Sequence, residues 1–531
     1  MTLSDQLPSR RPYNAVEDFV DANVARGAGP RTAFVDPERS LSYGELQQAT
    51  CRSAAAMRRL GLRQESRVAL LLVDTVDFPV VFWGAIRAGI VAVPLNTLLT
   101  SEQYAYVLND SRAEVLFVSP ALIRMIEPVI DKLTWLKSAV IVGADARAPG
   151  GLGALATYRF EDLLRDSEPQ IWTAPTVADE VAFWLYSSGS TGDPKGTKHV
   201  HASLIATARL YGQAVLGIRD DDVVFSAAKL FFAYGLGNSM SFPMTVGATA
   251  VLRPERVAPD LVLEVMRRHH PTVFFGVPTL YAAMLAHGAI GRGAGSDRLR
   301  CCVSAGEALP AHISERWREI VGVDILDGIG STEMLHIFLS NRLGDVRYGT
   351  SGKPVPGYEA RILGEDGHEL GIGEIGELVI RGPSAAEGYW NQRSKSRRTF
   401  VGEWTYTGDK YVRDADGYYQ YCGRTDDMFK VSGYWVSPFE LEAALVSHQA
   451  VLEAAVIGRQ DDDGLIKPKA FVVLKQGYAA DESLFEALRT HVKERAGVRK
   501  YPRWFEVRAE LPKTATGKIQ RFKLREEDGT G

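Results

Sequence analysis

The chain has 531 residues, of which 46% are hydrophobic and 24% are charged. This length allows roughly two to four domains, so we expect large buried cores. The 61 basic and 65 acidic residues give a net charge of −4, which excludes the basic excess of nucleic-acid-binding proteins and the acidic tails of disordered ones.

The sequence also lacks the marks of a membrane or secreted protein. Its first residues form no apolar stretch of the kind found in secretion signals. The most apolar region, 68–95, contains Asp74, Pro79 and Arg87, which a membrane-spanning helix tolerates badly. The four cysteines show neither metal-binding spacing nor a disulfide framework. We therefore expect a cytoplasmic protein that binds neither membrane nor nucleic acid.

The first strongly patterned segment is a β–α–β unit. Residues 67–73 form an apolar run of strand length, 78–89 show helical periodicity, and 90–96 form a second apolar strand. A helix capped by Thr100 or Ser101 is predicted next. Further strands are predicted at 113–119, 138–143, 181–186, 222–228, 248–253, 272–278 and 300–306. This alternation indicates parallel sheets covered by helices on both faces.

The pattern changes after about residue 345. Short predicted strands separated by Gly and Asp turns, at 358–367, 373–382 and 416–424, indicate a β-rich module. The last part of the chain alternates again between helices and strands. Its predicted helices are at 437–448 and 483–497, and its predicted strands are at 452–459 and 469–477.

Together these patterns predict an α/β fold. The expected parts are a large N-terminal domain of helix-covered sheets (1–425), which includes a β-rich subdomain at about 345–425, and a small α+β C-terminal domain (426–531). The boundary is placed where polar turn residues interrupt both patterns, within 423–435.

The stretch YSSGSTGDPKG, 186–196, has the composition of a phosphate-binding loop. Glycines allow backbone N–H groups to close on an anion, hydroxyls add donors, and Lys195 adds charge. It is not a Walker A motif, because Pro194 precedes the lysine. A bland surface turn is the alternative, and we favour nucleotide phosphates. The candidate phosphate-binding residues are Ser187, Ser188, Gly189, Ser190, Thr191, Gly192 and Lys195.

Other candidate residues are less distinctive by themselves. Thr332 precedes Glu333, so a phosphate-binding hydroxyl and a magnesium-binding carboxylate would be neighbours, although a helix cap fits equally well. Lys518 lies in the Thr- and Gly-containing stretch LPKTATGKIQR, which could also be a solvated basic segment. His199 and His201 would share one face of a strand, but no third ligand has suitable spacing for a metal site.

Six segments in this order resemble the adenylate-forming superfamily of acyl-CoA synthetases, luciferases and nonribosomal adenylation domains. They are YSSGSTGDPKG, SAGEAL, DGIGSTE, TGD, GRTDDMFKVSG and LPKTATGKIQR, and the match covers nearly the whole chain. The segments FFAYGLG and GIGSTEMLHIFLSN are most similar to the benzoate–CoA ligases and other aryl-CoA ligases of this superfamily.

The resemblance implies a two-step ligase that uses ATP, Mg²⁺ and coenzyme A. A small aromatic acid, with benzoate as the expected substrate, would be converted through acyl-AMP to the CoA thioester, releasing pyrophosphate and AMP. A medium-chain fatty acid remains an alternative substrate. A domain that loads a carrier protein and a noncatalytic nucleotide sensor remain alternative functions. The expected assembly is a monomer or a homodimer.

The resemblance also implies roles for individual residues. The loop at 186–196 would hold the β- and γ-phosphates, Thr332 would bind the α-phosphate, and Glu333 would hold Mg²⁺. Lys518 would bridge the substrate carboxylate and the α-phosphate. The remaining nucleotide-binding residues would be Gly306, Glu307, Ala308 and Asp327 near the adenine, and Asp409 with Arg424 at the ribose.

The acid pocket and the hinge are implied in the same way. Asp426 would be the hinge of a mobile C-terminal domain, which would bring Lys430, Ser432 and Gly433 toward CoA for the second step. Ile329 stands where the superfamily usually has an aromatic residue against adenine. The acid would be lined by Phe232, Ala233, Tyr234, Gly330, His336 and Ile337.

Overall fold

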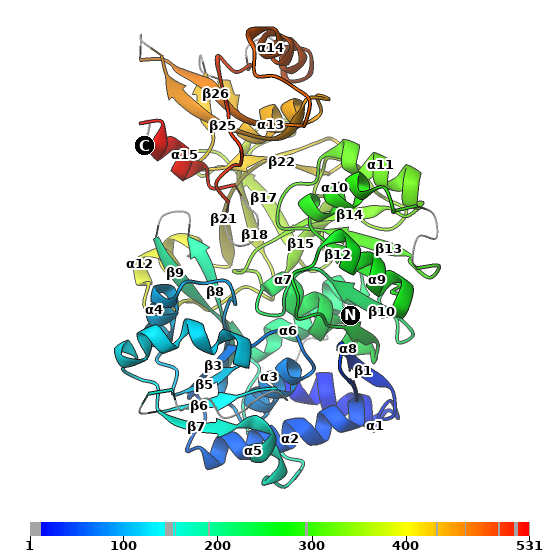
Figure 1. Cartoon of the computed structure of the whole chain (residues 1–531), viewed down its shortest axis with the longest axis vertical. Coiled ribbons are helices and arrows are strands. Elements are labelled where there is room, and N and C mark those ends of the chain that lie inside the picture. Colours follow the sequence, from blue (N-terminus) through cyan, green and yellow to red (C-terminus); the bar gives the residue numbers. More distant parts are fainter. Residues whose placement is uncertain are drawn as a thin grey trace.

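The computed structural model describes residues 12–143, 152–153, 155–189, 192–291, 296–431, 434–461, 464–497, 500–513 and 519–529. Two mostly parallel sheets lie side by side in the N-terminal part, and the C-terminal elements lie at the opposite end of the long axis (Figure 1). No helix within the described ranges is long and apolar enough to cross a membrane.

The first sheet has the strand order β19-β9-β8-β4-β3-β5-β6-β7. Strands β3 to β8 pair in parallel, whereas β9 and β19 add antiparallel pairs at one edge. The strands are β3 (Arg67–Leu71), β4 (Val91–Pro94), β5 (Val115–Val118), β6 (Ser138–Ile141), β7 (Ala156–Arg159), β8 (Val181–Gly189), β9 (Gly192–Val200) and β19 (Gly388–Tyr389).

The second sheet has the order β16-β15-β14-β13-β12-β10-β11-β1-β2. Its central strands pair in parallel, and β2, β15 and β16 pair antiparallel at the edges. The strands are β1 (Thr32–Val35), β2 (Ser40–Ser42), β10 (Val223–Ser226), β11 (Thr249–Val251), β12 (Val273–Gly276), β13 (Cys301–Ser304), β14 (Ile325–Gly330), β15 (Ile337–Ser340) and β16 (Lys353–Pro354).

Helices connect the parallel strands as the sequence predicts. Helix α4 begins after Thr100, whose side chain accepts from the Gln103 backbone N–H while Gln103 reaches back to Thr100, so the predicted cap is confirmed. The α-helices of this part are α1 (Ala22–Ala25), α2 (Tyr43–Arg59), α3 (Asp77–Arg87), α4 (Ser101–Ser111), α5 (Phe160–Arg165), α6 (His201–Thr207), α7 (Ala233–Leu236), α8 (Phe242–Val246), α9 (Pro259–His269), α10 (Pro278–His287), α11 (Ala311–Val321) and α12 (Arg393–Thr399). Short 3₁₀ and π segments are η2 (Glu17–Asp21), η3 (Pro120–Met125), η4 (Glu127–Lys132), η5 (Ala208–Gln213) and η6 (Gly237–Ser241).

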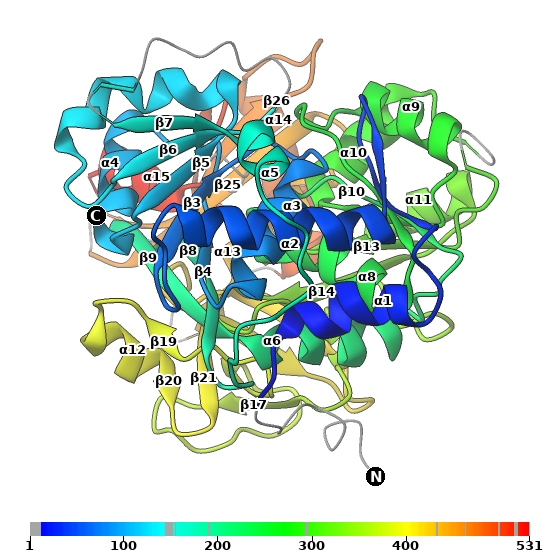
Figure 2. The ribbon, with the colours of Figure 1, turned by 90° about the horizontal axis from the view of Figure 1, so that it is seen from below.

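Both faces of the central parallel strands are buried. Val68 and Leu70 of β3 belong to a core that the two sheets share, whereas Ala69 and Leu71 belong to a separate core on the outer face. Figure 2 shows α2, which contributes to the shared core, extending from the first sheet toward the second. Because each strand contacts apolar groups on both sides, its sequence is a continuous apolar run without alternation.

The C-terminal half adds smaller sheets. An antiparallel third sheet, in the order β17-β18-β21-β20 with β22 on β21, lies between the two large sheets and the C-terminal elements (Figure 1). Its strands are β17 (Glu359–Leu363), β18 (Gly376–Arg381), β20 (Phe400–Val401), β21 (Trp404–Arg413) and β22 (Tyr419–Arg424). The C-terminal elements are β23 (Phe429–Val431), β24 (Tyr434–Val436), α13 (Pro438–Val446), β25 (Val451–Gln460), β26 (Ile466–Leu474), α14 (Glu482–Ala496), β27 (Trp504–Val507) and α15 (Arg521–Glu527).

The predicted fold class is confirmed: helix-covered sheets, an antiparallel β-rich region, and a smaller α+β part at the C-terminus. The predicted domain limits stay predictions. Two strands of the predicted β-rich subdomain pair outside it, since β16 joins the second sheet and β19 joins the first. The pairing of β19 with β9, which lies far away in the sequence, leaves no local sequence signal.

Candidate active site

The predicted site residues follow the carboxyl ends of neighbouring parallel strands. Residues 232–234 follow β10, 306–308 follow β13, and 331–333 follow β14. Strands β10, β12, β13 and β14 are consecutive parallel neighbours in the second sheet. Carboxyl ends of parallel strands meet at one edge, where ligands of open α/β sheets bind. The fold therefore brings these three segments to one edge although they are far apart in the sequence.

In two of these segments the predicted site residues are partly accessible to solvent, although the residues next to them in the sequence are buried. Residues 329–333 are half-buried, whereas 325–328 and 334–337 are buried. Residues 232–234 are also half-buried, although Gly235 and Leu236 directly after them are buried. The predicted contact residues Phe232, Ala233, Tyr234, Gly330, Thr332 and Glu333 are all in the partly accessible group, whereas His336 and Ile337 are buried.

The phosphate-loop candidate is the end of a β-hairpin and differs from the expected loop. Strand β8 extends to Gly189 and β9 begins at Gly192, with Ser187 opposite Lys195. This register holds Lys195 on a regular strand, so its side chain has a fixed direction. Ser190 and Thr191 lie outside the described residues, and for Ser188, Gly189 and Gly192 only the backbone is described.

Lys195 and Glu333 form an ion pair across the two sheets. Lys195 Nζ lies 3.5 Å from Glu333 Oε1, and the side chains are only 17% and 16% exposed. Removal from water makes such a pair stronger than a surface pair, but each charge becomes costly if its partner is lost. The structure thus places together two residues, 138 positions apart, of which one was proposed to bind phosphate and the other to hold Mg²⁺.

Tyr389, which the sequence analysis does not single out, lies between these two charges. Its hydroxyl donates to Glu333 Oε1 at 2.6 Å and accepts from Lys195 Nζ at 3.3 Å. Lys195 Nζ also lies 4.4 Å from the centre of the Tyr389 ring. We call Lys195, Glu333 and Tyr389 the charged end of the site.

Glu333 is suited to hold a divalent cation. Burial raises the pKa of its carboxyl, but the Lys195 charge and the Tyr389 hydrogen bond outweigh that effect and lower it below its ordinary value. The carboxylate is therefore ionised near neutral pH. No cluster of three or more metal-ligating side chains occurs within the described ranges. Mg²⁺ is commonly held by one or two carboxylates together with substrate phosphates, so Glu333 is the candidate ligand.

His199 connects the hairpin to the segment that carries Glu333. Its Nε2 donates to the carbonyl oxygen of Thr332 at 2.8 Å, and its ring stacks on Phe183 at 5.2 Å. Burial lowers the pKa of His199 to about 4, so the ring is neutral near pH 7. The expectation that His199 and His201 share one strand was wrong, because β9 ends at Val200 and His201 begins α6. His201 Nδ1 instead accepts from the Ala15 backbone N–H.

Asp409 and Arg424, the predicted ribose-binding pair, do lie together. They are opposite each other in the β21–β22 register, and Arg424 Nη1 donates to Asp409 Oδ1 at 3.0 Å. Gly408 has φ +70°, and a Cβ there would lie 3.0 Å from the Arg424 guanidinium. A glycine before Asp409 therefore serves both the left-handed turn and the close approach of the arginine.

A second cluster, which we call the neutral end, consists of Ala233, Tyr234, Asn238 and His336. His336 Nε2 donates to Asn238 Oδ1 at 3.1 Å and to the Tyr234 carbonyl at 3.3 Å. Burial lowers the pKa of His336 to about 3. The Tyr234 ring is 5.5 Å from the His336 ring, and its hydroxyl donates to carbonyls at the ends of β12 and β13. The polar groups here are therefore uncharged and held in place.

Glycines make room for this histidine. A Cβ at Gly237 would lie 2.4 Å from His336 Cδ2, and one at Gly330 would lie 2.5 Å from the His336 carbonyl oxygen. Both distances are too short for any side chain. Gly330 is the last residue of β14 and pairs with Ile337 of β15 beside a register shift. This pairing holds His336, the residue before Ile337, close to the end of β14.

The residues predicted near adenine surround the end of β13 and β14. Gly306 is exposed with φ +97°, and Glu307 and Ala308 are half-buried. Asp327 is buried, and burial raises the pKa of its carboxyl well above the ordinary value. Its Oδ2 accepts from the Leu309 N–H at 3.5 Å, whereas Oδ1 has no hydrogen-bond partner among the residues described here.

The structure describes only some of the site residues predicted in the C-terminal part. Asp426 is exposed and follows β22, and Asp427 pairs with Arg525 at 2.8 Å. Lys430 belongs to β23, which pairs with β24, but the structure does not describe the Lys430 side chain. Ser432, Gly433 and Lys518 lie outside the described residues.

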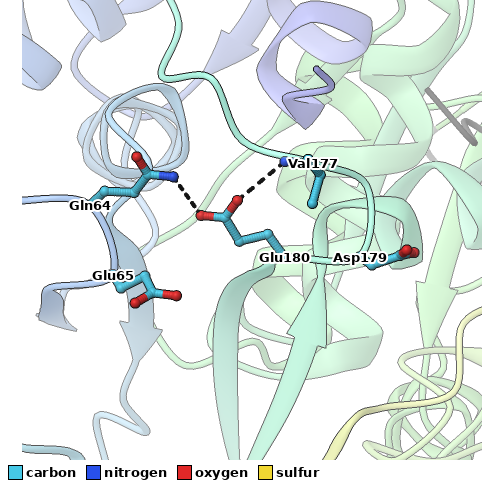
Figure 3. Close-up of a pocket in the computed structure, with 5 residues that line it drawn as sticks. All are labelled: Gln64, Glu65, Val177, Asp179 and Glu180. Atoms are coloured by element: carbon cyan, nitrogen blue, oxygen red, sulfur yellow. Dashed lines mark hydrogen bonds between the residues drawn. The ribbon is translucent and has the colours of Figure 1, made fainter. Parts of the chain in front are cut away.

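A separate open pocket of about 560 Å³ lies elsewhere on the surface (Figure 3). Glu180 accepts there from Gln64 Nε2 at 2.7 Å and from the Val177 N–H at 3.2 Å. The lining residues are Gln64, Glu65, Val177, Asp179 and Glu180, none of which is a predicted site residue. Three carboxylates without a basic residue repel polyphosphates, so this pocket does not compete with the charged end as a nucleotide site.

Residues 21–390 match the AMP-binding enzyme family, and residues 440–518 match its C-terminal domain family. The chain belongs to the AMP-binding enzyme family. A 4-hydroxybenzoate–CoA/benzoate–CoA ligase of Rhodopseudomonas palustris is 56% identical over 517 residues, 97% of this chain and 94% of that protein. The benzoate–CoA ligase of Thauera aromatica is 54% identical over 522 residues, 98% of this chain and 97% of that protein.

Solved structures of AMP-binding enzymes agree with this assignment. A benzoate CoA ligase from Burkholderia xenovorans LB400 matches with a TM-score of 0.88 and 49% identity, covering 97% of this chain and all of that one. The anthranilate CoA ligase AuaEII in complex with anthranoyl-AMP matches with a TM-score of 0.91 and 44% identity, covering 99% of both chains. The resemblance inferred from the six motifs is thereby confirmed.

Proposed function

We propose that this protein is an AMP-forming benzoate–CoA ligase. The observation that carries the proposal is the meeting of Lys195 and Glu333 at the carboxyl edge of the second sheet, beside a neutral cluster that follows β10 and β14. One part suits a magnesium-bound polyphosphate, and the other suits a small uncharged ring. The names of the two relatives that are more than half identical, both benzoate–CoA ligases, support benzoate as the acid.

In the first half-reaction the benzoate carboxylate attacks the α-phosphorus of ATP. A bond forms between a carboxylate oxygen and phosphorus, and the bond to pyrophosphate breaks. Lys195 exchanges Glu333 for the β- and γ-phosphates, and Thr332 binds the α-phosphate. Bound Mg²⁺, with Glu333 as its protein ligand, would supply the positive charge that lets two anions approach each other.

Nucleotide binding draws on the remaining candidates. Asp409, positioned by Arg424 at 3.0 Å, accepts from the ribose hydroxyls. Asp327, whose buried Oδ1 has no hydrogen-bond partner among the described residues, is the candidate acceptor for an amino group such as that of adenine. Gly306, Glu307 and Ala308 border the base, and Ile329 contacts it through apolar surface.

The neutral end selects the acid. The half-buried Phe232 and Tyr234 offer flat apolar walls, and Ala233 and Gly330 leave space for a ring. His336 carries no charge near neutral pH, because its pKa is about 3. A ring without a charge of its own therefore enters without leaving an unpaired ion buried.

In the second half-reaction the CoA thiol attacks the carbonyl carbon of benzoyl-AMP. A carbon–sulfur bond forms, the bond to AMP breaks, and the thiol proton is released. We place Lys518 at the first step alone and Lys430, Ser432 and Gly433 at the second, with rotation about Asp426 between them. The four cysteines are free and buried, which suits a reducing cytoplasm.

The test is a screen for AMP release with purified enzyme, ATP, Mg²⁺ and CoA. Benzoate should support release and give benzoyl-CoA by mass spectrometry, with 4-hydroxybenzoate as a second aryl acid and hexanoate and octanoate as aliphatic arms. A preference for the aliphatic acids would reject the aromatic pocket. AMP release with a carrier protein but not with CoA would reject the CoA ligase.

A further inference from the structure

Tyr389 joins three parts of the chain at the charged end. Its hydroxyl contacts Glu333, 56 positions earlier, and Lys195, 194 positions earlier. The same hydroxyl lies 3.5 Å from Thr399 Oγ1 in α12, and Phe400 packs on the ring at 5.4 Å. In Figure 1, α12 lies beside β9.

Strand pairing explains how the tyrosine reaches both charges. Tyr389 of β19 pairs with Thr197 of β9, and side chains two apart on a strand share a face. Lys195 is therefore the diagonal neighbour of Tyr389, close enough for a long side chain to lie against its ring. The Ala386 N–H donates to the Glu333 carbonyl at 2.8 Å, so the segment before β19 also fixes the backbone of the carboxylate.

The hydrogen bonds run in one direction. Lys195 donates to the Tyr389 oxygen, and Tyr389 donates its one hydroxyl proton to Glu333. Consecutive bonds of this kind strengthen each other. Lys195 has two alternative partners here, whereas the tyrosine proton is committed to the carboxylate at the shorter distance of 2.6 Å.

We propose that Tyr389 is a positioning residue for magnesium-bound ATP, an inference that rests on the proposed function. In the empty enzyme it keeps Lys195 and Glu333 together. When ATP enters, Lys195 turns to the phosphates, and the Tyr389 hydroxyl stays on Oε1 and holds the carboxylate toward the cation. Its ring fixes the stem of the lysine, and its hydroxyl fixes the acid.

The test compares Tyr389→Phe with Tyr43→Phe. Phenylalanine keeps the ring against Lys195 and Phe400 but removes the donor to Glu333. Tyr43 is a matched control, because it is buried and its hydroxyl donates to the Ala248 carbonyl at 2.7 Å without being one of the site residues. Melting temperatures of both variants establish that they fold.

The decisive readout is ATP binding by calorimetry without any acid present, so that no turnover occurs. Tyr389→Phe should weaken MgATP binding by about tenfold, the effect of losing one hydrogen bond to a charged group. It should leave binding of magnesium-free ATP, measured in EDTA, near the wild-type value. Tyr43→Phe should change neither. In steady state the KM for MgATP should rise, while benzoyl-CoA formation from supplied benzoyl-AMP stays unchanged.

Equal MgATP affinity in Tyr389→Phe and wild type would overturn the proposal, as would equal losses with and without magnesium. A double-mutant cycle with Lys195→Met gives a second test, since the two changes should be less than additive if they act on one unit. Additive effects would reject a joint action. If wild-type enzyme binds MgATP but releases no AMP with benzoate and CoA, the proposed function fails while the binding test of Tyr389 still stands.

Discussion

The charged end and the neutral end each take one residue from the short segment 330–337, Glu333 and His336, but the two side chains differ in charge. At the charged end, the Lys195 charge and the Tyr389 hydrogen bond lower the pKa of Glu333 despite its burial, so the carboxylate stays ionised. At the neutral end, burial holds the pKa of His336 at about 3, so a titratable ring stays uncharged.

This difference shows how one site can receive two unlike substrates. In the proposed mechanism a charged ligand replaces an internal partner, so Lys195 and Glu333 should lose little when they exchange each other for phosphate and Mg²⁺. An apolar ring has no charge to offer, so the side chains that receive it must be neutral beforehand. Changes at the charged end should therefore affect ATP, and changes at the neutral end should affect the acid.

The largest expected effect is that of Lys518→Ala, which removes the charge proposed to join the two ends. Benzoyl-AMP formation should fall about a hundredfold or more, because a charge-assisted contact to a transferring phosphate is worth several kcal/mol. With supplied benzoyl-AMP and CoA the first step is bypassed, and the rate should stay near wild type. Rapid-quench assays of the two half-reactions measure this. Full ATP-dependent activity, or equal loss of both steps in a folded variant, would contradict the role.

A buried carboxylate beside the neutral end should make stability depend on pH. Burial raises the pKa of Asp74 from 3.8 to about 6, against the lowering effect of Lys229, and both carboxylate oxygens accept from the Leu230 N–H. The folded state then binds more protons than the unfolded state between about pH 4 and pH 6, so this group lowers stability as pH rises through that window.

Comparison of wild type with Asp74→Asn isolates this contribution. The free energy of unfolding of wild type minus that of the variant should fall by at most about 3 kcal/mol from pH 4 to pH 6, and stay level above it. Denaturant titrations at a series of pH values supply the measurement. A difference that is flat, or that rises with pH, would mean that burial does not raise the pKa of Asp74 in the folded protein.

Ala233→Leu should impair binding of the acid at the neutral end without affecting binding of ATP at the charged end. The larger side chain takes up space beside Tyr234, and overpacking of this size costs about 1–3 kcal/mol, so the KM for benzoate should rise about tenfold or more. The KM for ATP should change little. Initial rates at varied benzoate and at varied ATP separate the two constants. Equal increases in both would show that the two ends are not independent.

The smallest effect is expected for Asp426→Pro, at a position that is a member of neither end. Proline fixes φ and should restrict rotation of the C-terminal part, so thioester formation should fall a few-fold more than adenylate formation. The same pair of half-reaction assays serves here. Equal reduction of both steps would place the hinge elsewhere or indicate misfolding.

Local signals in the sequence predicted the fold class, whereas the site residues were proposed from the resemblance of the six motifs and remain predictions. The capping pattern at Thr100 gave the start of α4, and apolar runs gave β3 to β6 and β10 to β13 because both faces of those strands are buried. The motifs around Lys195 and Glu333 were recognised separately. Their contact at 3.5 Å depends on how two sheets meet, which no spacing along the chain records.

Tyr389 could not be predicted for the same reason. A Gly–Tyr–Trp sequence is unremarkable, and the residue gains its place only when β19 pairs with β9 across nearly two hundred residues of chain. His199 was considered only as a metal ligand, because a histidine that fixes a distant carbonyl leaves no pattern in the sequence. Residues that hold others in place are the ones that sequence reasoning missed.

The most direct test of the central claim, that this site forms an acyl-adenylate of benzoate, is ATP–pyrophosphate exchange without CoA. Labelled pyrophosphate should enter ATP when benzoate and Mg²⁺ are present, and only at background rate when benzoate is omitted or replaced by hexanoate. Exchange that requires CoA would exclude a free benzoyl-AMP intermediate. Exchange that hexanoate supports and benzoate does not would contradict the assignment of the neutral end to an aromatic acid.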